Sequence, residues 1–138
     1  MKYLNEKTNT SHALDLVRTR VFGGKGDRAG VPNVAILITD GLPSNKTDPF
    51  VDGRGLARSA AQRLKDSGVE LITVGVTSQI DAQLLKDLSS PPQVKDKNYF
   101  TSADFNKLDA LIDNIVTSSC VQASTTPPPC KCSVCVNF

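Results

Sequence analysis

The chain has 138 residues, enough for one ordinary domain, and its 39% hydrophobic and 22% charged residues are typical of a globular protein. Its net charge of +2 is too small to indicate nucleic acid or an anionic membrane as a partner. No apolar run approaches the length of a membrane-spanning helix, so the sequence predicts no membrane span.

The first half of the chain predicts two helices with a strand between them. A helix is expected over residues 9–22, where apolar residues recur at helical spacing and Thr10 or Ser11 can cap the start. The apolar run at residues 34–38 predicts a parallel strand buried on both faces. A second helix is expected over residues 54–67, with alanines along one face and a glycine after its end.

The second half continues the same alternation. Residues 69–76 predict a second buried strand, and Ser78 with Asp81 resembles a capping box that opens a third helix. A short strand at residues 99–101 is followed by a strongly amphipathic helix at residues 104–116. Strands that alternate with helices predict an α/β fold with a mostly parallel sheet flanked by helices.

A single carboxylate stands out in this pattern. Asp40 follows the first predicted strand directly, in the run Ile38-Thr39-Asp40-Gly41. Open α/β sheets bind their ligands at the carboxyl ends of the strands. A carboxylate at this place indicates a cation, a proton or a donor-rich partner, and the alternative is that it caps nearby loop amides.

Six short motifs occur in order along the chain: TNTSHAL at residues 8–14, GVPNV at 30–34, ITDG at 38–41, GVELITVGV at 68–76, YF at 99–100 and DF at 104–105. Together they resemble the von Willebrand factor type A domain, in the form found in extracellular matrix proteins such as matrilins and collagens. The resemblance covers residues 1 to about 120 and implies a Rossmann-like fold. Residues 121–138 are then a Ser/Thr/Pro-rich linker and a cysteine-rich tail.

The resemblance also implies a metal site. In that family, a metal ion-dependent adhesion site carries an Asp-x-Ser-x-Ser motif, a Thr from a second loop and the Asp of a Thr-Asp-Gly motif. By resemblance, Thr8 and Asp40 correspond to the last two. Hydroxyl and carboxylate oxygens suit a hard cation such as Mg²⁺ or Mn²⁺, which can then take a carboxylate from a partner protein.

Two departures from the family pattern matter. The chain has no Asp-x-Ser-x-Ser motif, and it begins too late to include the first strand, which is central in the family's sheet. We therefore expect a partial domain with an incomplete metal site that binds cations only weakly. We also expect the strand at residues 34–39 to present an unpaired edge, which favours association.

The tail indicates an oxidising environment. All four cysteines, Cys120, Cys130, Cys132 and Cys135, fall within the last nineteen residues and are disulfide candidates. Asn45, in the sequon Asn45-Lys46-Thr47, is a glycosylation candidate. The protein is thus expected to be extracellular and secreted. The first ten residues are polar and carry no signal peptide, so we expect that a front part precedes them.

Three functions follow in order of preference. The first is an extracellular adhesion module that binds matrix proteins such as collagen, or cell-surface proteins, through a divalent cation. The second is a structural matrix module that assembles without metal. The third, a hydrolase or nucleotide-binding enzyme, lacks a nucleophile motif, and the glycine-rich loop at residues 23–30 follows a helix rather than a strand. We therefore expect no enzymatic activity.

Overall fold

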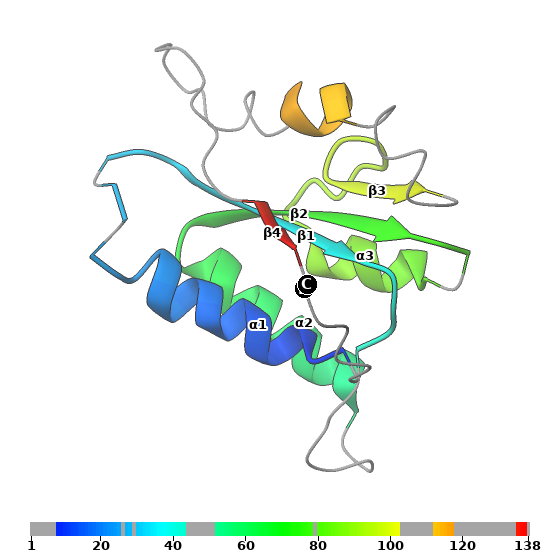
Figure 1. Ribbon diagram of the computed structural model, residues 1–138, viewed down its shortest axis with the longest axis horizontal. Coiled ribbons are helices and arrows are strands. Elements are labelled where there is room, and N and C mark those ends of the chain that lie inside the picture. The colour runs from blue at the N-terminus through cyan, green and yellow to red at the C-terminus, as the bar shows by residue number, and fades with distance from the viewer. Residues whose placement is uncertain are drawn as a thin grey trace.

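A parallel four-stranded sheet is the centre of the structure (Figure 1). The computed structural model describes residues 8–25, 27–28, 30–43, 52–78, 80–102, 112–117 and 135–137. The strands follow the order β3 (Tyr99–Ser102), β2 (Val69–Val76), β1 (Asn33–Thr39) and β4 (Cys135–Asn137), and every neighbouring pair is parallel. The predicted α/β fold with a parallel sheet is confirmed.

Helices lie on both sides of this sheet (Figure 1). On one side are α1 (Thr10–Leu16), which continues into the π-helical turn η1 (Val17–Val21), α2 (Gly53–Asp66) and α3 (Ala82–Leu88). Residues 112–117, also helical, lie on the other side. The rest of the predicted helix at 104–116 lies outside the described residues, as do Asn45, Cys120, Cys130 and Cys132.

The helix caps differ from the sequence prediction. Asn9 caps α1 by accepting a hydrogen bond from the His12 backbone N–H, so the prediction of Thr10 or Ser11 was wrong. At α3 the cap is Asp81, whose carboxylate accepts from the Leu84 N–H. Ser78 was expected to open this helix, but the helix starts only after Asp81 because this carboxylate can satisfy a first-turn N–H directly.

The main core lies between the sheet and its three-helix side. Ala57, Ala60, Ala61 and Leu64 of α2 are fully buried, and α2 packs against α1, α3 and β2. Small alanine side chains let α2 approach its neighbours closely. Thr73 of β2 adds a hydrogen bond at 2.9 Å from its hydroxyl to the Leu85 carbonyl of α3.

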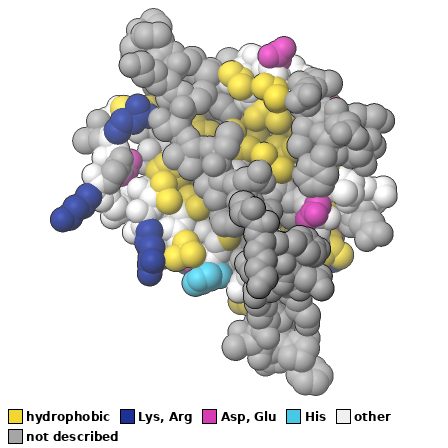
Figure 2. Space-filling model, viewed as in Figure 1, with side chains coloured by type: hydrophobic (Ala, Val, Ile, Leu, Met, Phe, Trp, Pro, Cys, Tyr) yellow, Lys and Arg dark blue, Asp and Glu magenta, His cyan; other side chains and the backbone are white. Residues whose placement is uncertain are grey.

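The opposite side of β1 is covered less completely. Val34, Ile36 and Ile38 of β1 are half-buried and pack against the buried side chains of β2, whereas Ala35 and Leu37 on the three-helix side are buried. The prediction that this strand is buried on both faces therefore holds on one side only. Figure 2 shows hydrophobic side chains gathered at the top of the molecule, over the helix at residues 112–117, whose Ile112 and Val116 are exposed.

The second edge of β1 is not left open, contrary to the prediction. β4 pairs there in parallel with Ile36, Leu37 and Ile38, so the end of the tail joins the sheet. The pairing spans only three of the seven residues of β1. A strand edge offers N–H and C=O groups that any extended segment can bind, which explains how a short stretch from the tail can take this place.

Candidate functional site

The three longer strands end together at one end of the sheet, on the right in Figure 1. Asp40 follows the last residue of β1 and is exposed to solvent. Thr77 follows β2, and its backbone N–H donates to the carbonyl of Ser102, the last residue of β3, at 2.9 Å. Asp40 thus lies where parallel α/β sheets bind ligands, as the sequence predicted.

The structure brings the second predicted ligand, Thr8, to the same place. A β-carbon placed on Gly41 would lie only 3.1 Å from Thr8 Oγ1, so the Thr8 hydroxyl lies over the residue that follows Asp40. Within the described part of the chain, the Asp40 carboxylate takes part in no hydrogen bond or ion pair. The alternative that Asp40 caps loop amides therefore finds no support among these residues.

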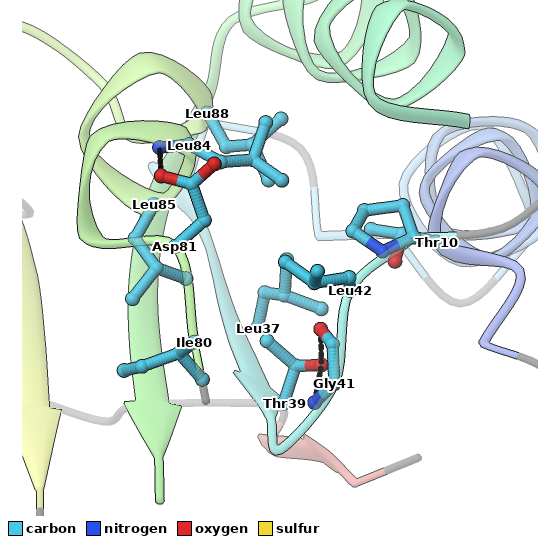
Figure 3. A pocket seen from close by; sticks show the side chains of 11 residues that line it. Thr10, Leu37, Thr39, Gly41, Leu42, Ile80, Asp81, Leu84, Leu85 and Leu88 are labelled. Atoms are coloured by element: carbon cyan, nitrogen blue, oxygen red, sulfur yellow. Dashed lines mark hydrogen bonds between the residues drawn. The ribbon is translucent and has the colours of Figure 1, made fainter. Parts of the chain in front are cut away.

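The turn that carries Asp40 is held by two threonines. Thr39 Oγ1 donates to the Gly41 carbonyl at 3.2 Å and accepts from the Gly41 N–H at 3.3 Å (Figure 3). Thr77 Oγ1 donates to the Asp40 backbone carbonyl at 3.4 Å. The sequence analysis assigned neither threonine a role in this turn. Thr39 precedes Asp40 directly, whereas Thr77 is brought to Asp40 only by the pairing of β1 with β2.

An apolar hollow lies beneath this turn. Figure 3 shows side chains of α3 facing those of β1 and the following loop across it. Its lining is mostly aliphatic and includes Leu37, Leu42, Ile80, Leu84, Leu85 and Leu88. Such a lining has no charged group to bind a polar ligand, except Asp81 at its margin, and that carboxylate caps α3 and pairs with Arg54 at 3.1 Å. The hollow supports the turn, and ligand chemistry belongs to the exposed groups above it.

Two other surface carboxylates, those of Asp15 and Asp87, are paired with arginine side chains. The Arg63 guanidinium donates to Asp15 at 2.7 Å and lowers the pKa of that carboxyl group. Burial raises the pKa of Asp87, but hydrogen bonds from Gln83 and Arg58 outweigh it, so the net shift is downward. Both therefore act as partners of arginine on the surface, in contrast to the exposed Asp40.

The donor set at Asp40 suits a hard cation in kind but not in number. A carboxylate and a hydroxyl are the oxygen ligands that Mg²⁺ and similar ions prefer, but such ions take about six ligands. In the described ranges, no group of three His, Cys, Asp or Glu side chains comes together to hold a metal. His12, the sole histidine, is exposed on α1. The residues present therefore fit part of a cation site.

Comparison of the sequence with known protein families identifies the family of this chain. Residues 1–114 match the family model of the von Willebrand factor type A domain. The chain belongs to this family. The type A domain resemblance given by the six motifs is thereby confirmed.

Relatives of this type A domain include matrix proteins. The chain is 30% identical to matrilin-1 of Gallus gallus over its whole length, which spans 25% of that protein. It is 31% identical to cuticlin-6 of Caenorhabditis elegans, covering 87% of the chain and 18% of the relative. The chain thus spans about a quarter or less of the length of these relatives.

Solved structures agree with the fold. Proximal thread matrix protein 1 from the mussel byssus superposes on 87% of the chain with a TM-score of 0.70 at 24% identity, and the match covers 29% of that protein. A second structure of the same mussel protein, which is 23% identical to the chain, has zinc in its metal ion-dependent adhesion site (MIDAS) motif. Manganese-loaded TRAP protein of Plasmodium vivax matches 77% of the chain and 39% of its own length, with a TM-score of 0.55 and 28% identity. In the part of the chain that the structure describes, no helix is long and apolar enough to cross a membrane.

Proposed function

We propose that this type A domain is an extracellular binding module that recognises matrix proteins such as collagen, or cell-surface proteins. Its family membership and its similarity to matrilin-1 and to collagen chains support this proposal. The single observation that carries it is that Asp40 is exposed at the carboxyl end of the sheet, and that the Thr8 hydroxyl lies over Gly41, the next residue.

A divalent cation would join the module to its partner. Asp40 and Thr8 would hold the ion, Mg²⁺ or Mn²⁺, and the ion would supply positive charge for a partner carboxylate. The metal-bearing MIDAS of mussel thread matrix protein 1 and the manganese in TRAP support a cation at this place. Because affinity for hard cations depends on the number of charged ligands, one carboxylate and one hydroxyl predict affinity in about the millimolar range.

The experiment compares binding of the chain to immobilised collagen with Mn²⁺ and with EDTA. Asp40→Asn removes the charge at the site, and Asp113→Asn removes the same charge from an exposed position on the helix at residues 112–117. We expect binding that needs Mn²⁺, is lost in Asp40→Asn and is kept in Asp113→Asn. Binding that is equal in EDTA and unaffected by Asp40→Asn would contradict the cation-dependent function.

A second candidate function is assembly of matrix without metal. It is favoured by the exposed Ile112 and Val116 on the helix at residues 112–117. In the same experiment this function predicts binding or self-association that persists in EDTA and weakens in Ile112→Ser. The names of matrilin-1 and cuticlin-6 denote no enzymatic activity, and we propose that this chain is not an enzyme either.

A further inference from the structure

Thr77 connects the ends of three strands. Its hydroxyl donates to the Asp40 carbonyl at the end of β1 (3.4 Å), and its N–H donates to the Ser102 carbonyl at the end of β3 (2.9 Å). Thr77 itself follows the last residue of β2. One residue therefore fixes the backbone of the Asp40 turn relative to the rest of the sheet.

The backbone of Thr77 is strained. Its φ is +94°, outside the small left-handed region near +60° that side chains tolerate, and a β-branched residue there is a genuine outlier. Elsewhere the described chain uses glycine for comparable angles, with φ of +75° at Gly30 and +84° at Gly68. A glycine at position 77 would adopt this angle without strain, so a threonine there needs another reason.

Strained residues persist mainly where the strained geometry serves a site. We infer that Thr77 is a positioning residue for the Asp40 turn: its hydroxyl holds the Asp40 backbone so that the carboxylate stays exposed beside Thr8. Thr77 does not bind the cation itself. The effect on cation binding rests on the proposed function, whereas the effect on the turn does not.

Three variants separate strain from positioning. Thr77→Gly removes both the strain and the hydroxyl, Thr77→Val keeps the branched shape but removes the hydroxyl, and Thr77→Ser keeps the hydroxyl. Gln93→Gly is the matched control, because Gln93 also has a positive φ (+59°) but lies in the loop between α3 and β3. Each variant is measured for its melting temperature, for binding of Mn²⁺ alone and for hydrogen exchange of the Gly41 amide.

We expect Thr77→Gly to melt about 3 °C or more above the wild type. The same variant should bind Mn²⁺ about tenfold more weakly, the scale of losing a group that orients a metal ligand. Thr77→Val should lose the same affinity without gaining stability, and Thr77→Ser should bind as the wild type does. Gly41 amide exchange should rise about tenfold in Thr77→Gly and Thr77→Val only, because the turn is then free to open.

The inference about Thr77 and the proposed function can be refuted separately. If the wild type binds Mn²⁺ but Thr77→Gly and Thr77→Val bind it equally well, the inference about Thr77 is overturned and the proposed function stands. If the wild type binds no Mn²⁺, the proposed function fails, and exchange at Gly41 still decides the role of Thr77. Unchanged exchange in Thr77→Val would overturn that role, and a lower melting temperature for Thr77→Gly would refute the strain.

Discussion

Gly75 allows α3 and the residues before it to pack against β2, and replacing it by alanine should destabilise the fold. A β-carbon at Gly75 would lie 2.3 Å from Ile80 Cδ1 and 2.5 Å from Leu85 Cδ1, closer than the 3.0 Å below which real β-carbons essentially never come. Both atoms are ends of flexible side chains, so the neighbours can yield at a cost. Overpacking of this kind costs about 1–3 kcal/mol.

The gain in chain stiffness offsets part of this cost. An alanine reduces the conformational entropy of the unfolded chain and returns about 0.4–1 kcal/mol where its backbone angles are allowed. We therefore expect Gly75→Ala to lower the free energy of unfolding by about 1–2 kcal/mol. For a domain of this size the melting temperature should fall by roughly 3–8 °C.

A second substitution tests whether the clash is the cause. Ile80→Val removes only Cδ1, the atom closest to the new β-carbon, and costs about 0.5 kcal/mol because Ile80 is half-buried. In the double variant the alanine regains this space, so the two losses should not add. We expect a favourable coupling of about 1 kcal/mol between the two substitutions, measured by urea unfolding followed by circular dichroism.

Gly68→Ala provides the control. Gly68 has a φ of +84° and open space around its missing side chain, so alanine there is strained by its backbone and not by a neighbour. Its loss of stability should simply add to that of Ile80→Val. The reasoning would be refuted if Gly75→Ala were as stable as the wild type, or if its loss added to that of Ile80→Val as it does for Gly68→Ala.

The remaining predictions concern the core, the surface and the tail. Thr73→Val should lower the free energy of unfolding by about 1 kcal/mol in urea, because it loses a buried hydrogen bond to Leu85 while that carbonyl keeps the Ser89 N–H; a loss above 3 kcal/mol would contradict this. Asp15→Asn should cost under about 1 kcal/mol at pH 7, since the ion pair with Arg63 is exposed. Because the folded pKa of Asp15 is lowered, this difference should vanish as the pH falls through that lowered pKa; a constant difference would count against the ion pair. Truncation at residue 134 removes β4 and should lower stability and cause concentration-dependent association in sedimentation, whereas an equally stable monomer would show that β4 does not protect the edge of β1.

Much of the fold could be predicted because its signals are local. The aliphatic run before Asp40 predicted β1, and the alanines of α2 predicted its buried face, since both patterns depend only on neighbouring residues. The position of Asp40 at the end of a parallel strand followed from the same run. The family motifs then indicated Thr8 as its neighbour, and the structure places the Thr8 hydroxyl over Gly41.

What could not be predicted depends on contacts between distant residues. The pairing of β4 with β1 joins segments about a hundred residues apart, and no local pattern selects that partner. The role of Thr77 follows from the register of β1 and β2, and its φ of +94° contradicts the preference of threonine. The choice of Asn9 and Asp81 as caps was missed because each helix start offers several polar residues that can cap it.

The most direct test of the account is a Mn²⁺ titration followed by NMR, because the paramagnetic ion broadens amide signals close to where it binds. The account predicts broadening centred on Thr8 and Gly41, a midpoint in about the millimolar range, and its loss in Asp40→Asn but not in Asp113→Asn. Broadening centred on another part of the surface, or broadening that persists in Asp40→Asn, would contradict it.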